Sequence, residues 1–398
     1  MKNVLRLLVF AALFTVFALP SYAQDAAAAQ TPAATGPCAE AEAKAALYNK
    51  FRENFNKSAD LQKLAYESGK EYLNKYGTCT AAGDEQITKY IQNWVGKYEK
   101  ATLEFNCSKA ANENPAQAFE ACAPWIAAGK DNLKPHLALV GAGIKSYTSG
   151  NMSLNSKAAA EARTTLELIE AGKTTDVWAP FATQQDAAAG LRYYIAAWSL
   201  ETNAEESATQ LIKVAQSSSV FAKEPATFQL LGASIYNGEL KKMVDEYKGK
   251  CEGKDATPEC DILLNKVNYA LDRVTDAYAR AIALSNANPS KYGAVSTKLR
   301  PVLATLYKQR HEGQETGLNE LIAGVLNKPL PLPGQEPPLP TPPASAADGA
   351  NGTGAATTPN TTTSGTTAKP AAPPTSKPTP AVTPTPKPTP AVQKPPRS

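Results

Sequence analysis

The chain has little of what most catalytic centres require. It contains only two histidines, His136 and His311, among 398 residues. Neither belongs to a His-Glu-x-x-His pattern, so a zinc protease is not indicated. None of the six cysteines forms a Cys-x-x-Cys pair, which argues against a thioredoxin-like redox centre and a zinc ribbon. We therefore expect a protein that is not an enzyme and that uses no metal and no cofactor.

A phosphate-binding loop is also incomplete. Gly141 and Gly143 precede Lys145 and Ser146, but the spacing is not that of a Walker motif. The stretch lies among helical patterns with no strand before it, whereas such loops follow a strand. Small residues at a close contact between helices explain this stretch better.

Long apolar runs are missing after the first residues of the chain. The run from Leu7 to Leu19 follows Lys2 and Arg6 and precedes Ser21-Tyr22-Ala23. This pattern is typical of a secretory signal peptide, with cleavage expected after Ala23. An uncleaved anchor is the alternative, although the run is shorter than the ~20 residues of a membrane span. We expect a periplasmic or secreted protein with no transmembrane segment after cleavage.

The folded part of the chain lacks an excess of charge. The formal net charge is +4, but residues 24–327 hold 33 basic and 35 acidic side chains. Nucleic-acid binding usually requires a basic stripe on the folded part. We therefore expect no nucleic-acid partner.

Alternating β-branched runs are absent, and helical spacing dominates residues 37–327. Ile91, Trp94, Val95 and Tyr98 recur at three-to-four-residue intervals, which predicts a helix over residues 84–105. Val267, Leu271, Val274 and Tyr278 predict a second long helix over residues 260–287. Glycines and prolines separate these stripes by short breaks, and short breaks place consecutive helices antiparallel. The pattern predicts an all-α array of αα-hairpins, either a solenoid or an irregular helical bundle.

Six cysteines in an exported chain predict three disulfide bonds. An antiparallel hairpin returns the start of one helix and the end of the next to the same place, and each close cysteine pair flanks such a break. We therefore predict pairing in sequence order, although fifteen pairings are formally open: Cys38 with Cys79, Cys107 with Cys122, and Cys251 with Cys260.

Parts of the array resemble tetratricopeptide repeats. Phe228, Leu231 and Gly232 stand at the spacing of that family's first helix, although Ile235 occupies the place of its tyrosine. Tyr278 and its neighbours Val274 and Ala281 match the second helix. The resemblance covers residues 40–100 and 185–310, and an insertion carrying Cys251 and Cys260 replaces the family's tight turn. It implies a curved solenoid that binds protein partners on its concave face.

Three aromatic residues are candidates for a partner-binding groove. Tyr194 and Trp198 lie four residues apart and share a helical face, and Tyr193 is adjacent. In a solenoid these rings could line the groove and contact a peptide or a sugar ring. Core packing is the alternative interpretation.

Residues 328–398 are rich in Pro, Thr and Ala, with the near-repeat KPTPAVTPTPKPTPAV. This composition predicts a disordered, extended spacer, and residues 24–36 form a shorter disordered leader. Lysines in the tail could make loose contacts with cell-wall polymers. The sequence favours a non-enzymatic scaffold for protein partners, with a polysaccharide-binding protein or a subunit of a glycan-processing enzyme as alternatives.

Overall fold

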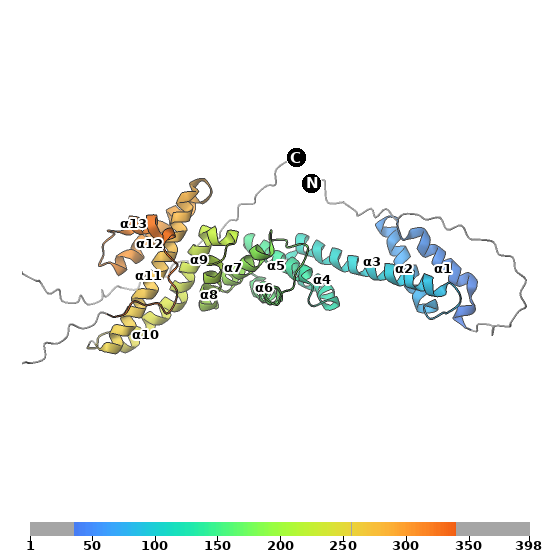
Figure 1. Ribbon diagram of the computed structural model, residues 1–398, viewed down its shortest axis with the longest axis horizontal. Coiled ribbons are helices and arrows are strands. Elements are labelled where there is room, and N and C mark those ends of the chain that lie inside the picture. Colours follow the sequence, from blue (N-terminus) through green and yellow to red (C-terminus); the bar gives the residue numbers. More distant parts are fainter. Residues whose placement is uncertain (1–35, 256, 340–398) are drawn as a thin grey trace, which may run out of the picture. The chain divides into compact units, whose positions relative to one another are not determined.

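The computed structural model describes residues 36–255 and 257–339. Every regular element within these ranges is a helix, which confirms the all-α prediction (Figure 1). None of the helices in this part of the chain combines the length and the apolar character needed to cross a membrane. The predicted signal peptide (1–23), residues 24–35 of the leader and the tail beyond residue 339 lie outside the described residues. Contacts divide the chain into two units, which meet between Glu99 and Lys100 within one helix.

Unit 1 is a small helical domain around an aromatic core. Its elements are η1 (Pro37–Ala39), α1 (Ala41–Asn54), α2 (Ala59–Tyr76) and the first part of α3 (Asp84–Glu113). Phe51, Tyr72 and Ile91 are fully buried where the three α-helices meet. A Cβ on Gly69 would lie 3.1 Å from the side chain of Ile91, so the absence of a side chain there lets α2 approach α3.

Unit 2 contains the remainder of α3 and a series of further helices. Their bounds are α4 (Pro115–Ala128), α5 (Leu133–Thr148), α6 (Asn155–Glu170), α7 (Gln184–Ser199), α8 (Ala204–Ala215), η2 (Val220–Lys223), α9 (Pro225–Ile235), the π-helical turn η3 (Tyr236–Leu240), α10 (Lys241–Cys251), α11 (Pro258–Ala287), α12 (Pro289–Arg310), α13 (Leu318–Gly324) and η4 (Val325–Asn327).

Capping residues explain where many of these helices begin. The side chains of Asn132, Thr183, Asn203 and Thr257 accept hydrogen bonds from backbone N–H groups in the first turns of α5, α7, α8 and α11. Prolines begin α4, α9, α11 and α12, a position at which the missing N–H has no partner within the helix. Proline breaks at Pro115, Pro225, Pro258 and Pro289 are therefore helix starts.

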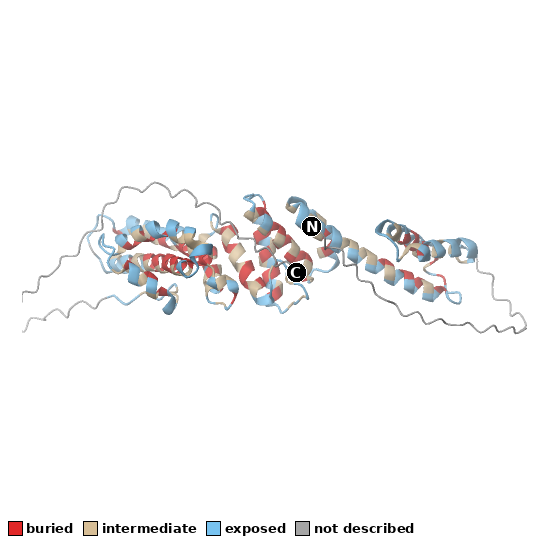
Figure 2. Ribbon diagram, turned by 90° about the horizontal axis from the view of Figure 1, so that it is seen from above, coloured by how far each residue is buried: buried red, intermediate tan, exposed pale blue. Residues whose placement is uncertain are grey.

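Each helix from α4 to α9 packs against the next one in the chain, and α9 then packs against α11. Three clusters of buried apolar residues follow this order: one among α3, α4 and α5, one among α5, α6 and α7, and the largest from α7 to η4. Buried residues line the inner face of α11 along most of its length (Figure 2). This arrangement confirms the predicted array of hairpins.

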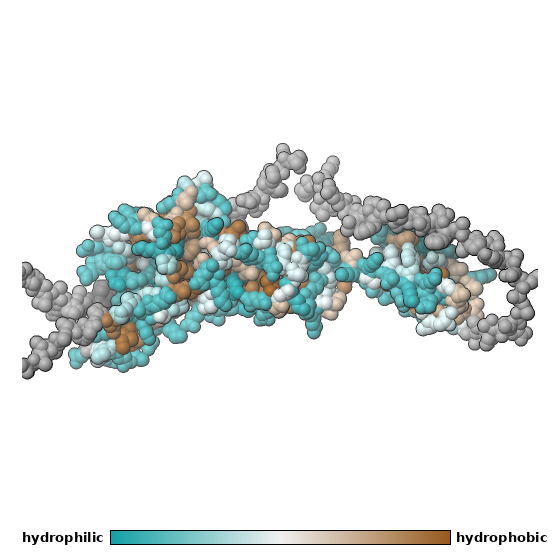
Figure 3. Space-filling view, in the orientation of Figure 1, coloured by the Kyte–Doolittle hydropathy of each residue, from teal (hydrophilic) through white to brown (hydrophobic). Residues whose placement is uncertain are grey.

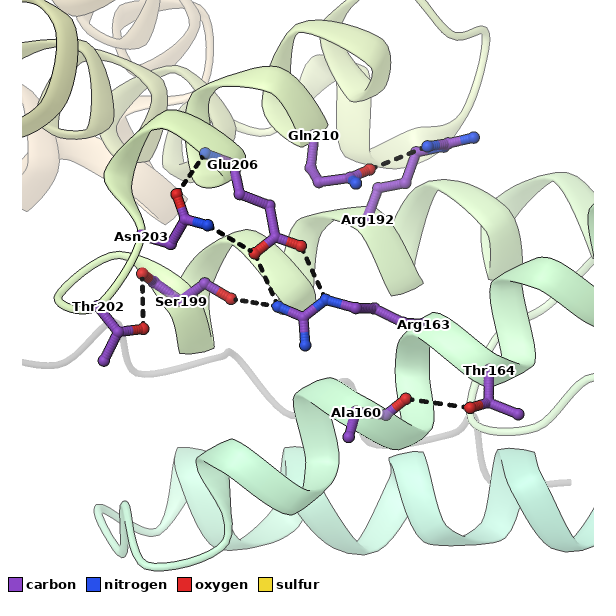
Figure 4. A network of polar contacts seen from close by, with 9 residues as sticks. All are labelled: Ala160, Arg163, Thr164, Arg192, Ser199, Thr202, Asn203, Glu206 and Gln210. Carbon is purple, nitrogen blue, oxygen red and sulfur yellow. Dashed lines mark hydrogen bonds and ion pairs between the residues drawn. The ribbon is translucent and has the colours of Figure 1, made fainter.

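A polar network fastens α6 to the α7–α8 hairpin (Figure 4). The guanidinium of Arg163 on α6 donates to both carboxylate oxygens of Glu206 on α8, at 2.7 and 2.8 Å. It also donates to the hydroxyl of Ser199 at the end of α7. A two-pronged guanidinium–carboxylate pair fixes orientation as well as distance. The side chain of Arg163 thereby links three consecutive helices, α6, α7 and α8.

Glycines allow close approach at two helix contacts of unit 2. A Cβ on Gly143 of α5 would lie 2.4 Å from the Cβ of Ala158 on α6. This confirms the interpretation of the Gly141–Ser146 stretch as a helix contact. A Cβ on Gly232 of α9 would lie 2.4 Å from the ring of Tyr278 on α11, so the glycine makes room for the tyrosine ring.

The three disulfide bonds pair in sequence order, as predicted. Cys38 joins Cys79 across the ends of the α1–α2 hairpin, whereas Cys107–Cys122 and Cys251–Cys260 each span the break between two consecutive helices. No described cysteine is free. By loop-closure entropy each bond stabilises the fold by roughly 3 kcal/mol. Three such bonds fit a compartment outside the reducing cytosol.

The structure describes residues beyond the predicted domain end at Asn327. Residues 328–339, here called the strap, lie along α11 instead of belonging to a disordered spacer. Leu330 packs against the largest apolar cluster of unit 2. These twelve residues, which the sequence assigns to the tail, carry leucines that residues 340–398 lack.

We predict opposite effects for alanine at two helical glycines. Gly232→Ala places a methyl group 2.4 Å from the edge of the Tyr278 ring and should lower the free energy of unfolding by about 1–3 kcal/mol. Gly293→Ala in α12 meets open space and should raise it by up to about 1 kcal/mol, because alanine favours the helix. Urea denaturation of the mature protein measures both. Equal effects at the two positions would contradict the proposed close contact.

Candidate functional site

One face of α11 carries a row of polar side chains that point at the strap. Asn265, Tyr269, Arg273 and Arg280 recur at intervals of four or seven residues, which places them on one side of the helix. Arg273 is 1% exposed and Arg280 is 6% exposed. Buried guanidinium groups require partners, because an unpaired buried charge is strongly destabilising.

Backbone carbonyl oxygens of the strap supply many of those partners. Arg280 donates to the carbonyls of Lys328 and Pro329 at 2.8 and 2.9 Å. Arg273 donates to Pro331 at 3.4 Å. Two further donations complete the row: Tyr269 to Leu332 at 2.8 Å, and Asn265 to Pro337 at 2.9 Å.

The order of these contacts shows that the strap runs antiparallel to α11. From Arg280 back to Asn265 the helix rises about 22 Å. An extended segment from Lys328 to Pro337 spans at most about 28 Å, and a turn with Gly334 at φ 75° shortens it. The two lengths are similar, so the donors meet strap carbonyls in the reverse order along the chain. We call the four donor side chains and the walls around them the α11 groove.

Carboxylates hold the two arginines of the α11 groove in place. Arg273 forms an ion pair with Glu239 of the π-helical turn η3. Arg280 pairs with Asp276 one turn earlier on α11, with 2.6 Å between Nε and Oδ1. Burial raises the pKa of Asp276, while its bonds with Arg280 and the nearby charge of Lys328 act in the opposite direction. The guanidinium groups are thus oriented by the protein and keep N–H donors for the strap.

The strap sequence favours an extended backbone conformation. Lys328, Leu330 and Leu332 each precede a proline, and a residue before proline is pushed to extended backbone. The prolines fix their own backbone angle near that of a polyproline II helix. Carbonyl groups of such a segment have no partner within it. The α11 groove therefore recognises backbone that proline has already arranged.

The strap does not fill the α11 groove. A cavity of about 680 Å³ lies between the strap residues Pro329–Leu332 and walls that include Phe228 of α9, Tyr269 and Arg280. Ala215 and Gln216 at the end of α8 also line it. Apolar residues gather over the part of unit 2 that contains α11 (Figure 3). The combination of apolar walls and a few polar groups is typical of ligand sites.

The three aromatic candidates lie in core contacts. Trp198 is 6% exposed and its ring is 5.4 Å from that of Tyr194. Tyr193 packs against the largest apolar cluster and against Phe221. Burial raises the pKa of Tyr194 to about 12 and also raises that of Tyr193. This placement favours core packing over a groove.

The two histidines have structural surroundings. The Nδ1 atom of His136 pairs with Glu161 of α6, and Nε2 lies 3.0 Å from the carbonyl oxygen of Lys130. Desolvation alone would lower the pKa of His136, but these hydrogen bonds and the charge of Glu161 raise it above 6.5. His311 stacks on Tyr307 with ring centroids 4.0 Å apart.

Comparisons of the chain with protein-family models, with curated proteins and with solved structures found no match.

Sequence reasoning missed the α11 groove, although two signals were present. Arginines and aspartates interrupt the apolar seam of residues 267–282, and a buried arginine must find an acceptor. The strap also alternates proline with lysine and leucine, whereas the later tail alternates it mainly with threonine and alanine.

We predict a pH-dependent stability that comes from His136. Because its folded-state pKa is raised, its stabilising contribution is complete below the ordinary value of 6.5 and is lost as pH rises through the folded value. The free energy of unfolding should fall less between about pH 5 and about pH 8 in Glu161→Gln than in the unmodified protein. Glu167→Gln, at an exposed position of α6, is the control and should keep the original profile. Identical profiles for all three proteins would contradict the prediction.

Proposed function

We propose that the chain is an exported, non-enzymatic binding scaffold that takes up an extended, proline-containing peptide of a protein partner in the α11 groove. The observation that carries this proposal is the row of four side chains on α11 that donate to carbonyl oxygens of an extended segment. Such donors recognise any peptide that presents its carbonyls at the same spacing. The strap is the occupant from the same chain.

Rigidity of the site supports a binding role. The donors lie on one long helix and not on a loop, and Glu239 and Asp276 fix both guanidinium groups. A site that is arranged before the ligand arrives loses less entropy on binding. Proline-rich ligands add to this advantage, because their extended conformation is already formed.

The wider architecture fits the same role. We propose that the hairpin array is a degenerate relative of the tetratricopeptide repeats, with Gly232 as the small residue that accommodates Tyr278. We further propose that the protein is periplasmic or secreted, with residues 1–23 as its signal peptide, and that residues 340–398 act as a spacer along the cell envelope.

Weakening the strap should expose the α11 groove to an added peptide. Leu330→Ser removes an apolar contact with the core cluster and should raise the affinity for a labelled peptide of sequence KPLPLPGQEPPL by about tenfold, because less of the site is occupied by the chain itself. Fluorescence anisotropy with the mature protein measures the dissociation constant.

Leu339→Ser is the matched control, since this leucine is 40% exposed at the far end of the strap. It should bind the peptide as the unmodified protein does. The proposal fails if the Leu330→Ser protein keeps its helical circular dichroism spectrum and still binds no proline-rich peptide.

A further inference from the structure

The strap contacts define which peptides the α11 groove selects. Counting Lys328 as the first position, the carbonyl oxygens used by Arg280, Arg273 and Tyr269 belong to positions one, two, four and five. Positions two and four are prolines, which hold the backbone extended. The strap residues therefore follow the pattern Lys-Pro-apolar-Pro-apolar.

Side chains add selectivity at three positions. The apolar residue at position three, Leu330, packs against the core cluster. Burial raises the pKa of the Asp276 carboxyl, and the positive charge of Lys328 at position one acts to lower it. The partner of Asp276, Arg280, donates to the first two carbonyls. Position five, Leu332, borders the cavity and is only half-buried.

The cavity gives a partner an advantage over the strap. A space of about 680 Å³ beside Leu330 and Leu332 remains available for a larger apolar side chain. The strap is tied directly to η4, and such a tether corresponds to a local concentration on the order of millimolar. A competing peptide must therefore bind more tightly than the strap, and filling the cavity provides the additional buried area.

We propose that the α11 groove is a reader of Lys-Pro-apolar-Pro-aromatic segments in an exported partner, and that such a segment displaces the strap by placing its aromatic ring in the cavity beside Leu332. This inference rests on the proposed peptide-binding function and names its ligand class and its regulation. The strap is a competitor within the same chain. It keeps the groove occupied against peptides whose affinity is no higher than its own.

The tail contains its own comparison ligands. Lys377-Pro378-Thr379-Pro380-Ala381 repeats the spacing of lysine and proline, and the same five residues recur from Lys387. In sequence, their prolines stand at positions two and four, as they do in the strap. Threonine at position three and alanine at position five, however, bury little apolar surface. These segments should bind more weakly than the strap and leave it in place.

The test uses labelled peptides of residues 328–335 and the full mature protein. The peptide with Leu332→Phe should bind about fivefold to tenfold more tightly than the strap sequence, because the ring adds apolar contact. The peptide with Pro329→Ala and Pro331→Ala should bind more weakly than the strap sequence, since it is no longer held extended. The peptide of residues 377–384 should also be weaker.

Two protein variants locate the binding site. In the Leu330→Ser background, where the strap competes less for the groove, Tyr269→Phe removes the donor to the carbonyl at position five, and the affinity should fall about fivefold. Tyr66→Phe is the control in unit 1, where the hydroxyl donates to Glu99 at the same distance of 2.8 Å. It should not change the affinity. Methyl NMR of Leu330 should show its signal moving to the position of an exposed leucine when the Leu332→Phe peptide is added.

The outcomes separate the two proposals. If the strap peptide binds the Leu330→Ser protein but phenylalanine at position five gives no gain, the ligand class is wrong while the binding function stands. If the peptide binds and the Leu330 methyl signal does not move, displacement is wrong. If no peptide binds either protein, both proposals are overturned.

Discussion

Two buried guanidinium groups on α11 determine how the C-terminal part of unit 2 is organised. Arg273 and Arg280 lie within an otherwise apolar seam, where an unpaired charge would be highly unfavourable. Arg273 pairs with the carboxylate of Glu239 and Arg280 with that of Asp276. Each arginine also donates to backbone carbonyls of the strap. The π-helical turn, the long helix and the proline-rich segment are therefore parts of one polar assembly surrounded by apolar contacts.

The general architecture follows from the sequence because its causes are local. Apolar residues at helical intervals define the stripes, and prolines and capping residues begin the helices. The cysteine pairing could be predicted for the same reason, since two pairs flank a break between consecutive helices and the third joins the two ends of one antiparallel hairpin. The close helix contact at Gly143 could also be predicted, because the glycine lies among helical patterns with no strand before it.

The α11 groove could not be predicted in this way, because it joins residues that are distant in the sequence. Tyr269 and Leu332 are 63 positions apart, and no periodicity connects them. Composition is also a poor guide here, because a proline-rich segment has the composition of a disordered spacer whether or not its carbonyls have hydrogen-bond partners. Tyr193 and Trp198 posed the opposite problem: aromatic residues suited to a groove are equally suited to a core, and only three-dimensional packing distinguishes the two.

The direction of the strap has a mechanical consequence. Because the strap is antiparallel to α11, a pull on Leu339 directed away from the helix would load the bond between Asn265 and Pro337 first. The load would then pass to Tyr269 and Arg273 and reach Arg280 last, where one nitrogen holds two carbonyls. Such a peeling sequence yields at low force and in small steps, so tension along the tail would open the strap gradually while the disulfide-closed hairpins stay folded.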